Sequence, residues 1–198
     1  MWYSFNYGSV HFVSIDTETD YPGAPEETST SGHFGNQLQW LENDLRQANE
    51  SRHLRPWIIV SGHRPIYSIE NSDQYGNITG QPIYLAKAVE DLFYKYYVDV
   101  YFCGHQHHYE RQWPVYQTIP EKSYVNPRAT TYILNGAAGN DEGHTLDPST
   151  IPDWNAASDD KHYGYGMLTV YNSSTIQWGF YKSVDDSLVD SITLFREH

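Results

Sequence analysis

Three histidines lie within four residues of one another, directly after an apolar segment of the chain. Residues 98–103 are rich in the side chains that occupy buried strands, and Gly104 separates them from His105, His107 and His108. A neutral imidazole is the commonest metal ligand that a protein offers, and His105 and His107 are spaced to converge on one point. Gly104 is expected to supply the sharp turn out of the strand. The pattern predicts one edge of a metal site; the alternative is a polar turn that merely follows a core strand.

A second segment with the same order of residue types lies upstream. Residues 57–60 are apolar, and Ser61, Gly62 and His63 follow them directly. Residues 81–97, between the two segments, carry one apolar stripe at helical spacing, formed by Leu85, Val89, Leu92, Phe93 and Tyr96. A strand, a helix and a strand of these lengths predict a βαβ unit with two parallel strands. We therefore expect His63 and His105 at the carboxyl ends of neighbouring strands, where open α/β sheets build their sites.

The rest of the chain is predicted to consist of strands, one more helix and polar loops. We predict strands at residues 10–15, 130–135, 166–171, 175–181 and 188–195, a helix at 36–49, and irregular segments at 17–35, 68–80 and 143–164. Asn36 and Gln39 are suited to cap the start of the helix. The last three strands are expected to be antiparallel, and the 68–80 loop is expected to overhang His63.

The histidine segments also resemble a known family. Val60-Ser-Gly-His63 and Gly104-His-Gln-His107 match the last two motif blocks of the metallophosphoesterases. The surrounding residues look like the purple acid phosphatases, particularly the fungal-type members, and the matching segments are 2–5, 10–20, 105–111 and 135–143. The resemblance covers nearly the whole chain in the family's order. The family's first three blocks (Asp-x-Gly, Gly-Asp-x-x-Tyr and Gly-Asn-His followed by an acid) do not occur before His63, where the family's order would place them.

The resemblance implies a fold, an activity and a set of metals. The fold is α/β, the C-terminal part of a four-layer αββα domain with mixed sheets, and residues 1–198 are expected to form the C-terminal portion of a single metallophosphoesterase domain. The activity implied is acid hydrolysis of phosphate monoesters by a hydroxide that bridges two metals, Fe(III) and a divalent Zn, Mn or Fe. By motif position, His63 and His105 would bind the divalent ion and His107 the ferric ion, with His105 and His107 also contacting substrate.

The metal site is expected to be incomplete in this chain. The bridging aspartate, the tyrosinate and the asparagine ligand of the resembled family belong to the missing blocks. Three imidazoles carry no negative charge to offset Fe(III), which favours hard oxygen ligands. We therefore expect these residues to be inactive alone and to need the missing N-terminal part of the same domain as a partner.

Three further residues are candidates for roles in catalysis or substrate binding. Arg64 follows a predicted ligand and could pair with phosphate, although an outward salt bridge is an equal alternative. His108 is a candidate substrate contact, with packing away from the site as the alternative. Plant relatives carry a proton-donating histidine about ten residues beyond His63, and Asp73 lies at that offset. Asp73 would serve as the acid only if its pKa were raised.

Composition restricts the partners and the setting. The formal net charge is −13, which argues against a basic surface for nucleic acid, and no segment is apolar for long enough to span a bilayer. Acceptor sequences for N-glycosylation occur at Asn49, Asn77 and Asn172, and with the resemblance they favour a secreted or vacuolar glycoprotein. The single cysteine, Cys103, excludes an internal disulfide. A second copy of the chain is a further candidate partner.

Two other classes of function compete with the phosphatase hypothesis. A cupin-type oxygenase also uses His-x-His followed by a glutamate, although Glu110 follows His107 too closely for that pattern. A non-catalytic glycosylated module could bind carbohydrate or a partner through tryptophans, with core packing as the simpler explanation of the same residues. The tryptophans in question are Trp40, Trp113, Trp154 and Trp178.

Overall fold

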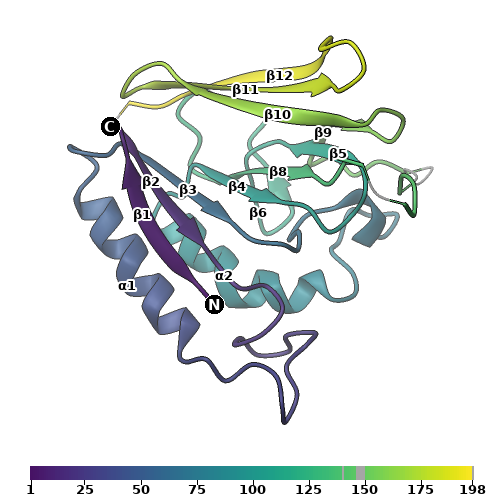
Figure 1. Cartoon of the computed structure of the whole chain (residues 1–198). Helices are drawn as coiled ribbons and strands as arrows, with labels where there is room; N and C mark the ends of the chain where they lie inside the picture. The colour runs from purple at the N-terminus through teal and green to yellow at the C-terminus, as the bar shows by residue number, and fades with distance from the viewer. Residues whose placement is uncertain (140, 146–149, 198) are drawn as a thin grey trace.

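The computed structural model describes residues 1–139, 141–145 and 150–197, and these residues stack in three layers. Two helices cover one face of a seven-stranded sheet, and a three-stranded sheet covers its other face (Figure 1). The α/β class and the mixed sheet expected from the sequence are confirmed. Three of the four expected layers are present among the described residues.

The described residues form two helices and three sheets. The helices are α1 (Gln37–Glu50) and α2 (Pro82–Lys95), with one 3₁₀ turn at Ile69–Asn71. The large sheet has the order β1 (Tyr3–Tyr7), β2 (Val10–Ser14), β3 (Trp57–Ser61), β4 (Val100–Cys103), β8 (Thr131–Asn135), β5 (Tyr109–Gln112) and β9 (Asn155–Asp159). The small sheet comprises β10 (Gly164–Val170), β11 (Thr175–Lys182) and β12 (Leu188–Phe195), and β6 (Val115–Tyr116) pairs with β7 (Ile119–Pro120).

The centre of the large sheet is parallel, as the predicted βαβ unit requires. Strands β2, β3, β4 and β8 are parallel neighbours, and α2 connects β3 to β4. Strands β1, β5 and β9 pair antiparallel to their neighbours at the two sides. The carboxyl ends of the four parallel strands therefore lie along one edge of the sheet.

Strand β3 explains why the central strands are apolar throughout. Ile58 and Val60 pack in the core under the two helices, whereas Trp57 and Ile59 pack in the core under the small sheet. Alternate residues of a strand point to opposite faces, so a strand covered on both faces is apolar at every position. The side chain of Phe180 on β11 is fully buried against this second face.

Helix α1 begins where the sequence indicated. The side-chain oxygen of Asn36 accepts a hydrogen bond of 3.0 Å from the backbone N–H of Gln39, which confirms the predicted cap. The buried side of the helix carries Leu41, Leu45 and Ala48. Within the described part of the chain, neither helix combines the length and apolar character needed to cross a bilayer.

Five strands were not predicted, namely β1, β5, β9 and the short pair β6 and β7. Strand β1 forms a hairpin with β2 through Gly8 and Ser9, and β9 lies inside the segment 143–164 that we predicted to be irregular. Residues 146–149 of that segment lie outside the described residues. Strand β5 begins at Tyr109, where we expected only a loop, because its charged residues are paired within the core and can be buried there.

Candidate functional site

The structure brings two of the predicted ligands together. His63 follows β3 and His105 follows β4, and the Nδ1 atom of His105 lies 3.1 Å from the Nε2 atom of His63. The two rings are nearly perpendicular, with centroids 4.9 Å apart. Both side chains are on the surface, where a ligand could reach them. The predicted juxtaposition of the two Gly-His ends is therefore confirmed.

Hydrogen bonds define which ring nitrogens carry protons in this cluster. Arg64 donates from Nη1 to His105 Nε2 over 2.9 Å, so Nε2 must be the acceptor and Nδ1 must carry the proton. His105 Nδ1 then donates to His63 Nε2. Burial, followed by the positive charges of Arg64 and His63, lowers the pKa of His105 below the usual histidine value. A lowered pKa favours the neutral form of His105, which is the form that metals bind.

The backbone at His63 is fixed by side chains from two other segments. Thr17 accepts hydrogen bonds at Oγ1 from the N–H groups of His63 and Arg64, over 3.1 and 2.9 Å. The hydroxyl of Tyr101, on β4, donates to the carbonyl oxygen of Arg64 over 2.7 Å. A Cβ atom at Gly62 would lie 2.6 Å from both Thr17 Cγ2 and the Tyr101 hydroxyl oxygen. The absence of a side chain at Gly62 therefore allows these anchors to approach.

The turn after β4 corrects one expectation. His105 itself has a positive φ of 68°, whereas Gly104 does not, and a Cβ at Gly104 would meet no atom within 4 Å. The prediction that Gly104 supplies the sharp turn is therefore wrong, and the ligand residue adopts the left-handed conformation. A second glycine governs the packing of this loop, because a Cβ at Gly136 would lie 1.8 Å from the carbonyl oxygen of Gln106.

His107 belongs to a neighbouring group of residues. Its Nδ1 atom lies 3.4 Å from a carboxylate oxygen of Glu142, and its backbone N–H donates to Thr145 Oγ1. The carbonyl oxygen of His107 also contacts His144 Nδ1, over 3.1 Å. In the ranges that the structure describes, no three histidine, cysteine or acidic side chains converge in a way that would hold a metal ion. Of the three expected ligands, only His63 and His105 are thus in contact with each other.

Arg64 makes the salt bridge that we considered as an alternative to phosphate binding. Its Nε atom donates to both carboxylate oxygens of Glu18, over 3.0 and 2.8 Å. The other end of the guanidinium group lies against His105. Glu18 was missed by sequence reasoning, because nothing in the spacing of the 17–35 loop indicates where its acids will lie.

His108 is placed in the interior instead of on the surface. Its side chain is fully buried, and Nε2 contacts Glu110, whose carboxylate is also fully buried. In this arrangement the ring does not reach solvent. The candidate role of His108 in substrate binding therefore has no support from its position.

Glu110 joins the histidine loop to the loop that follows His63. Its carboxylate accepts hydrogen bonds from the Ser68 hydroxyl and the Ile69 N–H. Ser68 also donates to Gln106, the residue between the two predicted ligands, and Gln106 donates to Asn71. The 68–80 loop thus contacts the histidine loop through Ser68 and Asn71, with Glu110 as a buried anchor, and its predicted position over His63 stays a prediction.

Asp73 lacks the property that a general acid requires. It is a half-exposed loop residue that accepts hydrogen bonds from the N–H groups of Tyr75 and Asn77 and from the Asn77 side chain. These bonds, those from Asn77 first, lower the pKa of Asp73 below the usual carboxyl value. A raised pKa was the condition for its role as proton donor, so the expectation for Asp73 fails on that condition.

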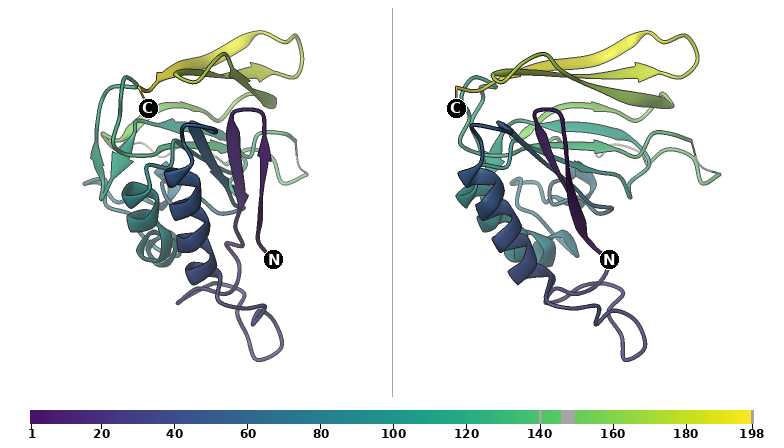
Figure 2. Two further views of the ribbon diagram at one scale, coloured as in Figure 1. Left: turned by 90° about the vertical axis from the view of Figure 1, so that its left-hand side faces the viewer. Right: turned by 60° about the vertical axis from the view of Figure 1, so that its left-hand side comes forward.

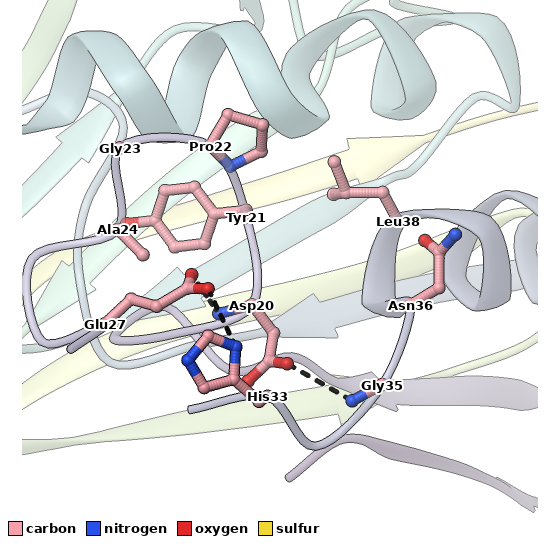
Figure 3. A pocket seen from close by; sticks show the side chains of 10 residues that line it. All are labelled: Asp20, Tyr21, Pro22, Gly23, Ala24, Glu27, His33, Gly35, Asn36 and Leu38. Carbon is pink, nitrogen blue, oxygen red and sulfur yellow. Dashed lines mark hydrogen bonds and ion pairs between the residues drawn. The ribbon is translucent and has the colours of Figure 1, made fainter. Parts of the chain in front are cut away.

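A hollow of about 790 Å³ lies in the loop that carries Thr17 and Glu18. Figure 3 shows Tyr21, Glu27 and His33 around it, with Glu27 close to the His33 ring; their Oε1 and Nδ1 atoms are 3.5 Å apart. Tyr21 also lines a much smaller cavity, of about 80 Å³, together with Arg64, Asn71 and His105. The loop after β2 thus places an acidic hollow next to the histidine pair.

The predicted glycosylation sites differ in their exposure. Asn77 and Asn172 are exposed, in the 68–80 loop and in the turn between β10 and β11. Asn49 is half-buried on α1 and accepts a hydrogen bond from Arg52 Nε over 2.9 Å. These positions are compatible with an attached glycan at Asn77 and Asn172 more readily than at Asn49.

The donor set of the site fits one kind of metal better than another. His63 and His105 offer two neutral imidazoles, ligands that suit zinc and other divalent transition metals. His105 Nε2 accepts from Arg64 and His63 Nε2 accepts from His105, so metal binding at either atom requires one of these hydrogen bonds to be exchanged. No carboxylate in the described residues joins the histidines in a group that could hold Fe(III).

Two family models match the chain. The model described as calcineurin-like phosphoesterase matches residues 3–109, and the model described as iron/zinc purple acid phosphatase-like protein C matches residues 129–191. The first spans β1 to the start of β5 and includes both Gly-His ends.

Curated relatives and a solved structure agree with these matches. The chain is 35% identical to an acid phosphatase of Aspergillus ficuum over 98% of its own length, and 35% identical to human acid phosphatase type 7 over 99%. It is also 32% identical to a probable inactive purple acid phosphatase 27 of Arabidopsis thaliana over 100% of its length. The purple acid phosphatase PPD1 of yellow lupin has the same fold, with a TM-score of 0.74 over 100% of the chain, which covers 33% of the lupin chain, at 23% identity.

The chain spans less than half the length of these relatives, namely 37%, 46% and 31% of the Aspergillus, human and Arabidopsis proteins. The two family models and the relatives nevertheless indicate the same family, and their matches together cover most of the chain. The chain belongs to the calcineurin-like phosphoesterase family, in its purple acid phosphatase branch.

Proposed function

We propose that these residues form the C-terminal portion of a metal-dependent acid phosphatase that hydrolyses phosphate monoesters. The observation that carries the proposal is the contact between His63 and His105 at the carboxyl edge of a parallel sheet. Neutral imidazoles at that edge are suited to bind a divalent metal, and Arg64 beside them supplies a positive charge. The names of the curated relatives support the same activity.

The proposed metals are Fe(III) and a divalent Zn, Mn or Fe. Two such ions would acidify a bridging water and stabilise the attacking and leaving oxygens of the ester. In this proposal His63 and His105 hold the divalent ion, and His107 contributes to the ferric site together with ligands from outside residues 1–198. Arg64 would turn its guanidinium from His105 towards the phosphate while its Nε stays paired with Glu18.

We further propose that the remaining ligands come from another part of the same domain. A groove of about 770 Å³ lies between the two sheets, and most of its lining is apolar, including Tyr7, Phe12, Leu168 and Trp178. Tyr3, Phe5 and Tyr7 alternate along the edge strand β1 and are largely exposed. Additional strands would cover this groove and complete the site, and a second copy of the chain is the competing occupant.

The proposed setting is secreted or vacuolar, with N-linked glycans at Asn77 and Asn172 and a third candidate at Asn49. The two first sites are exposed. Mass spectrometry before and after treatment with a glycosidase would detect attached glycans. Peptide mapping would then identify which of the three asparagines carries one in the natural protein.

The competing functions have less support. Cupins are closed double-sheet β-folds, whereas His63 and His105 lie on an open parallel sheet joined by α2. Trp154 and Trp178 are buried, so core packing accounts for two of the four tryptophans that a carbohydrate-binding module would use.

The test compares two lengths of protein. A longer protein that includes the upstream residues, loaded with iron and zinc, is expected to hydrolyse p-nitrophenyl phosphate at acid pH, and residues 1–198 alone are expected not to. His105→Ala should abolish turnover in the longer protein, while His33→Ala, an exposed histidine of the 17–35 loop, should leave it unchanged. Turnover by residues 1–198 alone would refute the proposed incompleteness, and an inactive metal-loaded longer protein would refute the phosphatase function.

A further inference from the structure

A second cluster of polar side chains lies between the β1–β2 hairpin and helix α1. Figures 1 and 2 show that the hairpin and the helix run side by side. A pocket of about 260 Å³ lies there, and its lining includes Ser4, His11, Asp44 and Arg55. Neither of the described histidine groups, at His63 and at His107, contributes to it.

The acceptors of this pocket are already engaged. The two carboxylate oxygens of Asp44 accept hydrogen bonds from the Ser4 hydroxyl, over 2.7 Å, and from His11 Nε2, over 2.8 Å. His11 Nδ1 lies 2.8 Å from the side-chain oxygen of Asn6. Both ring nitrogens of His11 thus face oxygen atoms, and both carboxylate oxygens of Asp44 already have partners.

The groups that are not engaged are chiefly donors. Within the described ranges, the Nε atom of Arg55 is buried without a hydrogen-bond acceptor, and no carboxylate lies within ion-pair distance of this guanidinium. Asn6 and Ser51 also line this pocket, and no hydrogen bond of the Asn6 amide nitrogen or of the Ser51 hydroxyl is described. A buried donor without an acceptor is costly, and a bound anion would relieve that cost.

From this pocket we infer a second binding site, for a small tetrahedral oxyanion such as inorganic phosphate, held by Arg55, Asn6 and Ser51. The volume admits such an ion with a few water molecules, since one water occupies about 30 Å³. Arg55 supplies the charge and a planar fork of donors, and it turns towards the ion to replace the missing acceptor. The inference does not depend on the proposed phosphatase function.

The position of the site separates it from the histidine pair. Arg55 lies just before β3 and His63 just after it, so the length of this five-residue strand lies between them. At about 3.3 Å per residue that length is about 16 Å. An anion at Arg55 would therefore leave His63 and His105 free, and it would tie the hairpin to α1.

The experiment is a calorimetric titration of residues 1–198 with inorganic phosphate, after treatment with a chelator and at constant ionic strength set by chloride. We expect saturable binding at one site, weakened about tenfold or more by Arg55→Gln and less by Arg55→Lys. The matched control is Arg46→Gln, an exposed arginine of α1 whose partner is Glu50, and it should bind like the unaltered chain. Far-UV circular dichroism would establish that each variant is folded.

Two results would overturn the inference. One is the absence of saturable phosphate binding by the folded, unaltered chain. The other is binding that survives Arg55→Gln but is lost in His105→Ala, which would assign the anion to the histidine pair.

Discussion

The Nδ1 atom of His105 lies 3.1 Å from the Nε2 atom of His63, although 42 residues separate them in the chain. The contact joins the ends of two parallel strands, β3 and β4, and Arg64 donates a further hydrogen bond to the same His105 ring. The two imidazoles together offer two ligands to one divalent metal ion.

Replacing either histidine should weaken the binding of a divalent metal. His63→Ala or His105→Ala is expected to lower the affinity of the chain for Zn²⁺ by more than about tenfold, because each removes one ligand of a two-ligand set. Isothermal titration calorimetry provides the measurement, with His33→Ala as the control at an exposed position that pairs only with Glu27 and Thr28. Zinc affinity that is the same in all four proteins would contradict the assignment.

A pair of glycine variants tests how the histidine loop is packed. Gly136→Ala is expected to destabilise the fold by about 2 kcal/mol or more and to lower zinc affinity, because its Cβ would lie 1.8 Å from the Gln106 carbonyl oxygen. Gly104→Ala should have little effect, since no atom lies within 4 Å of its Cβ. Urea unfolding of the two variants measures the difference. Equal urea midpoints for the two variants would mean that the loop moves to accommodate a side chain at Gly136 without a cost in stability.

Glu110 is predicted to be the most sensitive buried carboxylate near the site. Glu110→Gln should destabilise the protein by about 3 kcal/mol, because an amide nitrogen would face donors such as the Ser68 hydroxyl and the Ile69 N–H. Chemical denaturation gives the free energy of unfolding. Glu50→Gln, at an exposed pair with Arg46 on α1, is the comparison and should barely move the unfolding midpoint. If the Glu110 variant is as stable as this control, the proposed role of Glu110 as an anchor is contradicted.

Asp190 should set part of the acid limit of stability. Burial alone would raise the pKa of this carboxyl, but hydrogen bonds and charge from Arg111, with the Tyr109 hydroxyl, outweigh burial and lower it. A pKa that is lower in the folded state adds stability above the unfolded value of about 3.9, and that stability is lost as the pH falls through the folded pKa.

The corresponding experiment measures unfolding free energy between about pH 2.5 and 6. The unaltered chain should lose stability below about pH 4 more steeply than Asp190→Asn, which has no proton to gain at this position. The variant should be the less stable of the two at pH 6, where Arg111 loses its partner. Parallel pH profiles would show that Asp190 does not contribute to the acid limit.

The elements that could be predicted from the sequence are those with a strong local signal. The stripe from Leu85 to Tyr96 gave α2, Asn36 marked the start of α1, and the two Gly-His ends located β3 and β4. Strand β1 was missed because its alternating aromatics leave no buried face to distinguish a strand from a loop. Strand β5 was missed because Glu110 and Arg111 are charged, and their partners Ser68 and Asp190 are distant in the chain.

The site was predictable in its ligand types and less so in its surroundings. His63 and His105 follow from spacing and strand order, whereas the role of Thr17 and Glu18 depends on how the 17–35 loop folds back on β3. The direction of the Asp73 pKa could not be read from the sequence, since it depends on a local turn closed by Asn77.

Cys103, the only cysteine of the sequence, is buried on β4 two residues before His105. Burial raises the pKa of its thiol, so the reactive thiolate is scarce in the folded molecule, and a maleimide can attack only where the sheet has opened. The alkylation rate of Cys103 therefore measures how often β4, the strand before the histidine loop, opens locally. No cysteine needs to be introduced for this measurement.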